Sequence, residues 1–181
     1  ALIAQWQLVG FIHGVMNTDN MALSGETIDY GPCAFMDRYD PATVFSSIDR
    51  HGRYAYANQP SIGQWNLARF AEALLPLIDP DEPRAIEAAK EALASYASEF
   101  EVHWLHGMRA KLGLTNAEPE DEKLARNLLD LMQSERADFT GTFAALTEGS
   151  LADHPAFSSW LAAWESRRSR QPGNPQASRI L

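Results

Sequence analysis

Three polar residues near the start of the chain have the types and spacing needed for chemistry on a phosphate ester. Asp19 and Asn20 are neighbours, and Asp29 follows Asn20 by nine positions. Carboxylate and amide oxygens suit Mg²⁺, which takes one or two ligands from protein and the remainder from phosphates and water. We therefore predict that Asn20 and Asp29 bind a metal ion. Asp19, next to them, is the candidate acceptor of a proton from an incoming hydroxyl group.

The spacing around these residues matches part of a protein-kinase catalytic loop. Kinases carry a His-Arg-Asp motif, an Asn seven positions after its His, and a later Asp-Phe-Gly motif whose Asp holds magnesium. Here His13 precedes Asn20 by seven positions, and Asp29 begins the tripeptide Asp-Tyr-Gly. The position of the kinase base is occupied by Val15. The pattern thus keeps the metal ligands of a nucleotide enzyme and lacks the kinase base.

The segment between Asn20 and Asp29 must bring the two proposed ligands together. Gly25 lies in it between two short apolar stretches, a pattern typical of a tight turn between paired strands. We therefore predict a β-hairpin over residues 23–28. Such a hairpin would place Asn20 and Asp29 within reach of one metal ion.

The remainder of the chain is predicted to be helical. Apolar residues recur at helical spacing at the start of the chain and over four later segments, which are 65–78, 84–112, 120–132 and 154–167. The second of these four is expected to be one long helix that ends at Gly113. Trp160 and Trp164 are expected in the core. The predicted fold class is mainly α with a small β-hairpin, corresponding to the C-terminal lobe of a kinase-like α+β fold.

The sequence divides into a loop-rich part and a helical part. Residues 1–62 are dense in Gly, Pro, Asp and Asn and are predicted to form a catalytic and metal-binding loop region. Residues 63–181 are predicted to form the helical lobe. The first lysine is Lys90, and the glycine-rich pattern G-x-G-x-x-G does not occur. A complete kinase needs both features to bind phosphates, so we expect the N-terminal nucleotide-binding lobe to be absent from this chain.

Composition limits the partners of the protein. Fifteen Lys and Arg against 24 Asp and Glu give a formal charge of −9, which disfavours a nucleic-acid or anionic-membrane surface. No apolar run is long enough for a membrane span. Cys33 is the one cysteine of the 181 residues, so an intrachain disulfide is excluded and a reducing compartment is expected.

Several short motifs resemble the selenoprotein O family, also called YdiU. They are GFIHGVMNTDNM at residues 10–21, GETIDYGP at 25–32, GRY at 52–54, NQP at 58–60 and WNL at 65–67. Asn174-Pro175, followed by Ile180-Leu181, is similar to a late segment of the family. The resemblance implies a protein-kinase-like fold that binds ATP in an inverted pose and moves AMP to Ser, Thr or Tyr hydroxyls of proteins with Mg²⁺ or Mn²⁺.

For individual residues, the resemblance implies that Asp19 is the proton acceptor. It further implies that Asn20 and Asp29 bind the metal and that Asp29 also faces ATP. When ATP lies in the inverted pose, its α-phosphorus faces the acceptor hydroxyl, so a base in the kinase position would have no proton to accept. The resemblance therefore explains why Val15 can occupy that position. The family setting implies a cytoplasmic protein in a bacterium and a mitochondrial one in a eukaryote.

Two other functions remain open. A conventional phosphotransferase on the same fold is disfavoured by Val15, because the kinase base is missing. A nucleotide-binding pseudokinase scaffold is disfavoured because it needs neither a base such as Asp19 nor the metal ligands Asn20 and Asp29.

Overall fold

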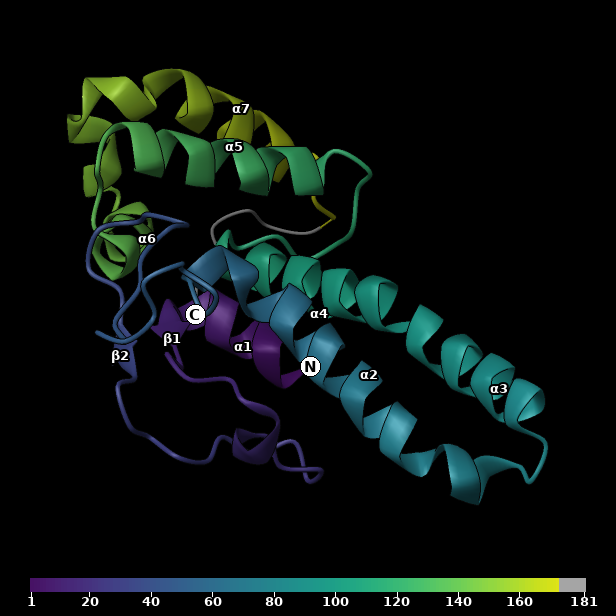
Figure 1. Cartoon of the computed structure of the whole chain (residues 1–181). Coiled ribbons are helices and arrows are strands. Elements are labelled where there is room, and N and C mark those ends of the chain that lie inside the picture. Colours follow the sequence, from purple (N-terminus) through teal and green to yellow (C-terminus); the bar gives the residue numbers. More distant parts are fainter. Residues whose placement is uncertain (173–181) are drawn as a thin grey trace.

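The computed structural model describes residues 1–172 and is mainly helical, as predicted (Figure 1). The segment around Asn174 that resembles a late family motif lies outside the described residues. The helices are α1 Leu2–Val9, α2 Gln59–Ile78, α3 Glu82–Ala94, α4 Tyr96–Lys111, α5 Asp121–Ser134, α6 Phe139–Glu148 and α7 Ser158–Ser169. Four short 3₁₀ turns accompany them, namely η1 Thr18–Asn20, η2 Tyr56–Asn58, η3 Ser150–Asp153 and η4 Pro155–Phe157.

A two-stranded antiparallel sheet is present, but it is not where the sequence predicted a hairpin. Strand β1, Phe11–Ile12, pairs with β2, Ala34–Phe35, so that Phe11 faces Phe35. Residues 23–28 form no strand, and Leu23 at the tip of this loop is 79% exposed. An isolated hairpin is marginal in water, whereas β1 buries both of its side chains in the core. The prediction of a hairpin over 23–28 is therefore wrong.

The single helix predicted over residues 84–112 is two helices that meet at Ser95. The Ser95 hydroxyl donates to the carbonyl of Ala92, and the Ser98 hydroxyl donates to the carbonyl of Ser95. Such side-chain bonds compete with the helical ladder and bend it. The interruption lets α3 pack along α2 while α4 packs against α1 (Figure 1). After α4, Gly113 adopts a φ of 66°, the left-handed conformation typical of a helix end.

The core consists of two clusters of buried side chains. The larger one joins α4, α5, α6 and α7 and contains Trp160 and Trp164, as predicted; their rings stack with centroids 6.1 Å apart. The smaller cluster lies under α1, β1 and the start of α2, with the members Ile3, Trp6, Phe11, Met16 and Ile62. This second cluster supports the loop that carries the proposed site residues.

A buried ionic group fixes α4, α5 and α7 to one another. The Asp121 carboxylate accepts from Arg109 Nε at 2.7 Å and from Arg167 Nε at 2.6 Å. Burial acts to raise the pKa of Asp121, but hydrogen bonds from Arg167, the Glu118 amide and Arg109 outweigh it and hold this pKa below its ordinary value. The group is structural, since its bonds join α4, α5 and α7 to one another.

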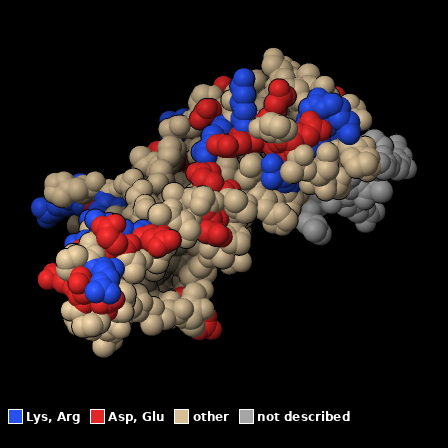
Figure 2. All heavy atoms as spheres, turned by 90° about the vertical axis from the view of Figure 1, so that its right-hand side faces the viewer, with Lys and Arg blue, Asp and Glu red and all other residues tan. Residues whose placement is uncertain are grey.

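The surface carries charges of both signs. Figure 2 shows Lys and Arg interspersed with Asp and Glu on the face that it presents, with no continuous basic field. Within residues 1–172, no helix has the length and apolar character needed to cross a bilayer.

Candidate active site

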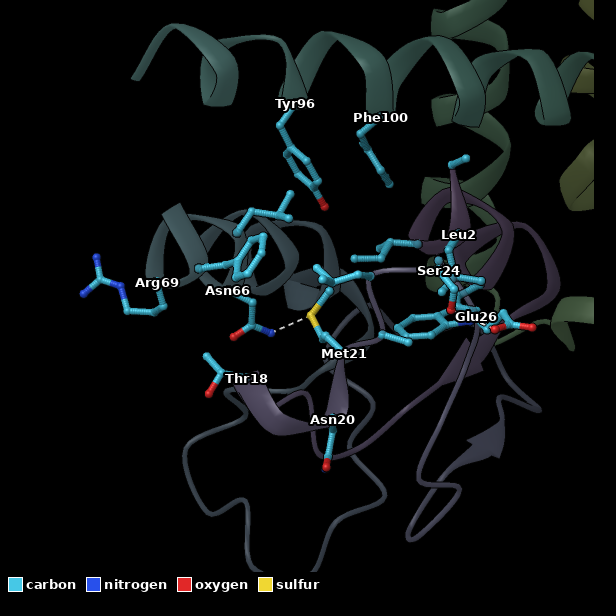
Figure 3. Close-up of a pocket in the computed structure, with 18 of the residues that line it drawn as sticks. Leu2, Thr18, Asn20, Met21, Ser24, Glu26, Asn66, Arg69, Tyr96 and Phe100 are labelled. Atoms are coloured by element: carbon cyan, nitrogen blue, oxygen red, sulfur yellow. Dashed lines mark hydrogen bonds between the residues drawn. The ribbon is translucent and has the colours of Figure 1, made fainter. Parts of the chain in front are cut away.

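Asp19 and Asn20 lie on η1, a single 3₁₀ turn at the edge of the molecule. The Asp19 side chain is exposed, so a hydroxyl group of another molecule can approach it. Asn20 is half-buried, and its Nδ2 donates to the carbonyl of Val15 at 3.0 Å. Because the side-chain nitrogen of Asn20 is used in this bond, its Oδ1 is the atom that remains to bind a metal ion. Figure 3 shows Asn20 pointing away from the neighbouring cavity with its oxygen outermost.

Asp29 stands at the far end of the loop in an unusual backbone conformation. Its φ is 53°, one of two positive values among the non-glycine residues described. Asp tolerates the left-handed region better than most residues, but the conformation still costs free energy. The carbonyl of Asp29 accepts from the Gly31 amide at 2.8 Å, which closes a tight turn. The side chain is exposed, like that of Asp19.

A path of hydrogen bonds links Asn20 to the residue before Asp29. Asn20 donates to the Val15 carbonyl, and the Val15 amide donates to His13 Nδ1 at 3.4 Å. Because Nδ1 accepts, the ring proton lies on Nε2, which donates to the Ile28 carbonyl at 2.8 Å. The fully buried His13 thus joins the two ends of the loop. In place of the predicted hairpin, this path connects Asn20 to the backbone directly before Asp29.

Two buried polar residues of α2, Gln59 and Asn66, bind the backbone of the loop that carries Asp19. Neither was assigned a role from the sequence. The Gln59 side chain accepts from the His13 amide and donates to the Phe11 carbonyl, both at 2.9 Å. Asn66 donates to the Met16 carbonyl at 2.9 Å. The two residues are seven positions apart and therefore share one helix face. Asn66 lies within the helix predicted over 65–78, and a polar residue next to its apolar positions was a signal that could have identified it. Gln59 precedes that predicted helix, because the observed α2 begins six residues earlier.

Further bonds hold the outer part of the loop. Trp6 of α1 donates from Nε1 to the Thr27 hydroxyl at 2.9 Å. Tyr54 donates its hydroxyl hydrogen to the side-chain oxygen of Asn17, directly before η1. The positions of Asp19 and Asp29 are thus set by contacts to α1, α2 and the loop before α2.

A cavity of about 820 Å³ lies beside η1, between α1, α2, α4 and the loop over residues 21–26 (Figure 3). Thr18, Asn20 and Glu26 contribute to its wall, and most of the remaining wall is apolar. Its size is within the range of small-molecule sites. The cavity therefore adjoins the proposed metal ligand Asn20 on the side away from its oxygen.

The proposed metal ligands form a pair rather than a cluster. Among residues 1–172, no group of three or more His, Cys, Asp and Glu is gathered in a way that could hold a metal ion. A pair of oxygen ligands suits Mg²⁺ that is completed by phosphates and water, and it does not suit a structural zinc site. Asn20 and Asp29 as metal ligands, and Asp19 as proton acceptor, remain predictions.

Comparison with known proteins gives the family. The family model described as protein adenylyltransferase SelO matches residues 1–164. A protein nucleotidyltransferase YdiU from Halalkalibacterium halodurans is 63% identical over 175 residues, covering 94% of this chain and 36% of the relative. The YdiU of Brevibacillus brevis is 59% identical over 182 residues, covering 98% and 37%.

The YdiU of Alkaliphilus metalliredigens is 57% identical over 186 residues, covering 100% of this chain and 38% of the relative. The chain thus spans little more than a third of the length of the curated relatives that it matches. Since the family model matches most of the chain, the resemblance stated from the motifs is confirmed, and the chain belongs to the SelO family.

Proposed function

We propose that this chain carries the catalytic loop of an enzyme that transfers AMP from ATP to Ser, Thr or Tyr hydroxyls of proteins. The observation that carries the proposal is the hydrogen-bonded path from Asn20 through Val15 and His13 to Ile28, beside an exposed Asp19. The names of the relatives, which are protein nucleotidyltransferases, support it. The relatives named above are bacterial, so we expect a cytoplasmic enzyme.

The residues of the loop have separate roles in this proposal. Asp19 accepts the proton of the attacking hydroxyl, whose oxygen bonds to the α-phosphorus of ATP while the bond to the β-phosphate oxygen breaks and pyrophosphate leaves. Asn20 Oδ1 and the Asp29 carboxylate would hold Mg²⁺ or Mn²⁺. Such an ion neutralises phosphate charge and orients the nucleotide. His13 would hold the two metal ligands in position relative to each other, because it binds the Ile28 carbonyl next to Asp29.

A kinase-like phosphotransferase is the second candidate, because the same loop order occurs in kinases. The position of the kinase base is Val15, which is half-buried and whose backbone already binds Asn20 and His13. No carboxylate is therefore available there. For both the AMP transferase and the phosphotransferase, the phosphate-binding lysine is expected in the part of the longer relatives that this chain does not cover.

Intact-protein mass spectrometry distinguishes the candidates. A protein with the full length of the relatives is incubated with ATP, Mg²⁺ and an acceptor protein, and the acceptor is weighed. The proposal predicts the mass gain of one adenylyl group, and an Asp29→Asn variant serves as the matched control without gain. A gain of one phosphate would support the phosphotransferase, and bound ATP with no gain would support a pseudokinase scaffold.

A further inference from the structure

An exposed tryptophan on α2 is flanked by two arginines. Trp65 is 41% exposed. The guanidinium carbon of Arg53 lies 4.6 Å from the centre of its ring, and that of Arg69 lies 5.2 Å from it. Arg53 is also 5.7 Å from the ring of Tyr54. Two cations are thus held on one aromatic surface in a chain whose net charge is −9.

This surface adjoins the loop of Asp19. The Asp49 carboxylate accepts from the amides of Arg53 and Tyr54, each at 2.8 Å, and so fixes the backbone that presents Arg53. The Tyr54 hydroxyl then binds Asn17, two residues before Asp19. From the other side, Arg69 and Thr18 line the same cavity (Figure 3). Both arginines are therefore anchored next to η1.

The two guanidinium groups retain capacity to bind an anion. A guanidinium group that packs on a ring uses its face, while its edge N–H donors remain directed outward and can bind a carboxylate in bidentate fashion. Within residues 1–172, Arg53 has no carboxylate partner in an ion pair. Arg69 pairs with Glu72 between side chains that are both about half exposed, and such pairs are weak and exchange readily.

We propose that Arg53, Trp65 and Arg69 form a docking surface for an acidic segment of the acceptor protein. Glutamate or aspartate side chains near the target hydroxyl bind the edges of the two guanidinium groups, which the Trp65 ring holds in place. The contact selects acceptors and directs their hydroxyl toward Asp19. The inference rests on the proposed function, because it takes the partner to be the protein that receives the nucleotide.

Peptide binding to the 181-residue chain tests the surface without any transfer reaction. The probes are a fluorescein-labelled peptide with one Thr flanked by four Glu, and its counterpart with Gln in place of Glu. Fluorescence anisotropy at low salt is expected to show about fivefold tighter binding of the acidic peptide, from two exposed charge contacts. The preference is expected to shrink as salt rises.

Variants assign the preference to the surface. The double variant Arg53→Gln and Arg69→Gln is expected to abolish the preference, whereas Lys123→Gln, which removes one positive charge at an exposed position of α5, retains it. Arg53→Lys is expected to reduce it only in part, because the charge stays and the planar fork is lost. Circular dichroism confirms that each variant is folded.

Three results of the peptide-binding measurements would overturn the inference. They are equal binding of the two peptides, an unchanged preference in the double arginine variant, and a loss of preference in Lys123→Gln as large as in the double variant. Competition by Mg²⁺-ATP that depends on the two arginines would assign the surface to the nucleotide and overturn it as well. Because no transfer is measured, these failures are distinct from a failure of the proposed function, which the mass of the acceptor reports.

Discussion

The buried ring of His13 donates a hydrogen bond from Nε2 to the carbonyl of Ile28 at 2.8 Å, and Ile28 directly precedes Asp29. Nδ1 of the same ring accepts from the Val15 amide, and the Val15 carbonyl accepts from the Asn20 side chain. One side chain therefore connects the backbone that binds Asn20 to the backbone directly before Asp29. The short loop needs no strand pairing of its own to keep these ends in place.

The first prediction concerns His13. His13→Ala removes a buried side chain and leaves the Ile28 carbonyl without its partner, so we expect the free energy of unfolding to fall by about 1–3 kcal/mol. Urea denaturation followed by circular dichroism measures this change. His51→Ala, at an exposed position, is the control and should change stability by less than about 0.5 kcal/mol. Equal effects of the two variants would show that His13 does not hold the loop.

The second prediction separates the two aspartates. In a protein of the full length of the relatives, Asp29→Ala is expected to remove transfer and nearly all metal-dependent ATP binding, because it deletes a metal ligand. Asp19→Ala is expected to lower the transfer rate by about 10²–10⁴ and to leave ATP binding largely intact. Calorimetric titration with ATP and Mg²⁺ gives the affinities. An equal loss of binding in both variants would make Asp19 a ligand and withdraw its role as base.

The third prediction is a pH dependence of stability from Lys111. Its Nζ donates to the Leu8 carbonyl at 2.6 Å and lies 3.8 Å from the centre of the Phe143 ring. Burial lowers the pKa of Lys111 from 10.5 to about 8. Between these two pH values the unfolded chain keeps a proton that the folded chain has lost, so the free energy of unfolding rises with pH in this window.

Lys111→Met isolates this effect. The stability of the parent relative to the variant is expected to rise by about 2–3 kcal/mol from pH 8 to pH 10.5, since one pKa unit corresponds to about 1.4 kcal/mol. Tyr39 and Tyr96, whose pKa values burial raises to about 12, are present in both proteins and cancel in the difference. Urea denaturation across this pH range supplies the values. A difference that is flat or falls with pH would contradict a buried, readily deprotonated Lys111.

The helices were predicted from the periodicity of apolar residues, whereas the strands could not be predicted from local turn signals. The spacing of apolar residues located five helical segments and placed Trp160 and Trp164 in the core, because burial of an amphipathic face is a local property of the sequence. It did not locate α6, Phe139–Glu148. The turn signal at Gly25 was misleading, since a strand forms where its side chains find a buried partner. That partner, β2, could not be read from the residues around Gly25.

Residue types and spacing led to the proposal of Asp19, Asn20 and Asp29 as site residues, but they could not predict which other residues support the loop. The order of His13, Asn20 and Asp29 indicated a kinase-like loop. The loop residues that Gln59 and Asn66 bind lie 46 to 50 positions earlier in the chain. These bonds depend on how α2 packs under the loop. The spacing of residues in the sequence does not predict how α2 packs against the loop.

The fourth prediction is that Val15→Asp does not create a kinase. A kinase base must lie within hydrogen-bond reach of a hydroxyl that faces the γ-phosphorus. In the proposed pose the hydroxyl faces the α-phosphorus, so a carboxylate at position 15 has no proton to accept. It also introduces a charge at a half-buried position, and a thermal melt of the variant monitors the resulting loss of stability.

The proposed function requires that AMP, and not phosphate, moves to the acceptor protein. It is tested most directly with ATP that carries one radioactive isotope at the α-phosphorus and another at the γ-phosphorus. Transfer is measured for a protein of the relatives' full length and for its Val15→Asp variant. With the parent protein, the acceptor is expected to gain only the α-label, while the γ-label leaves in pyrophosphate. With the variant, the acceptor is expected to gain no γ-label. An acceptor that gains the γ-label without the α-label would contradict the proposed function.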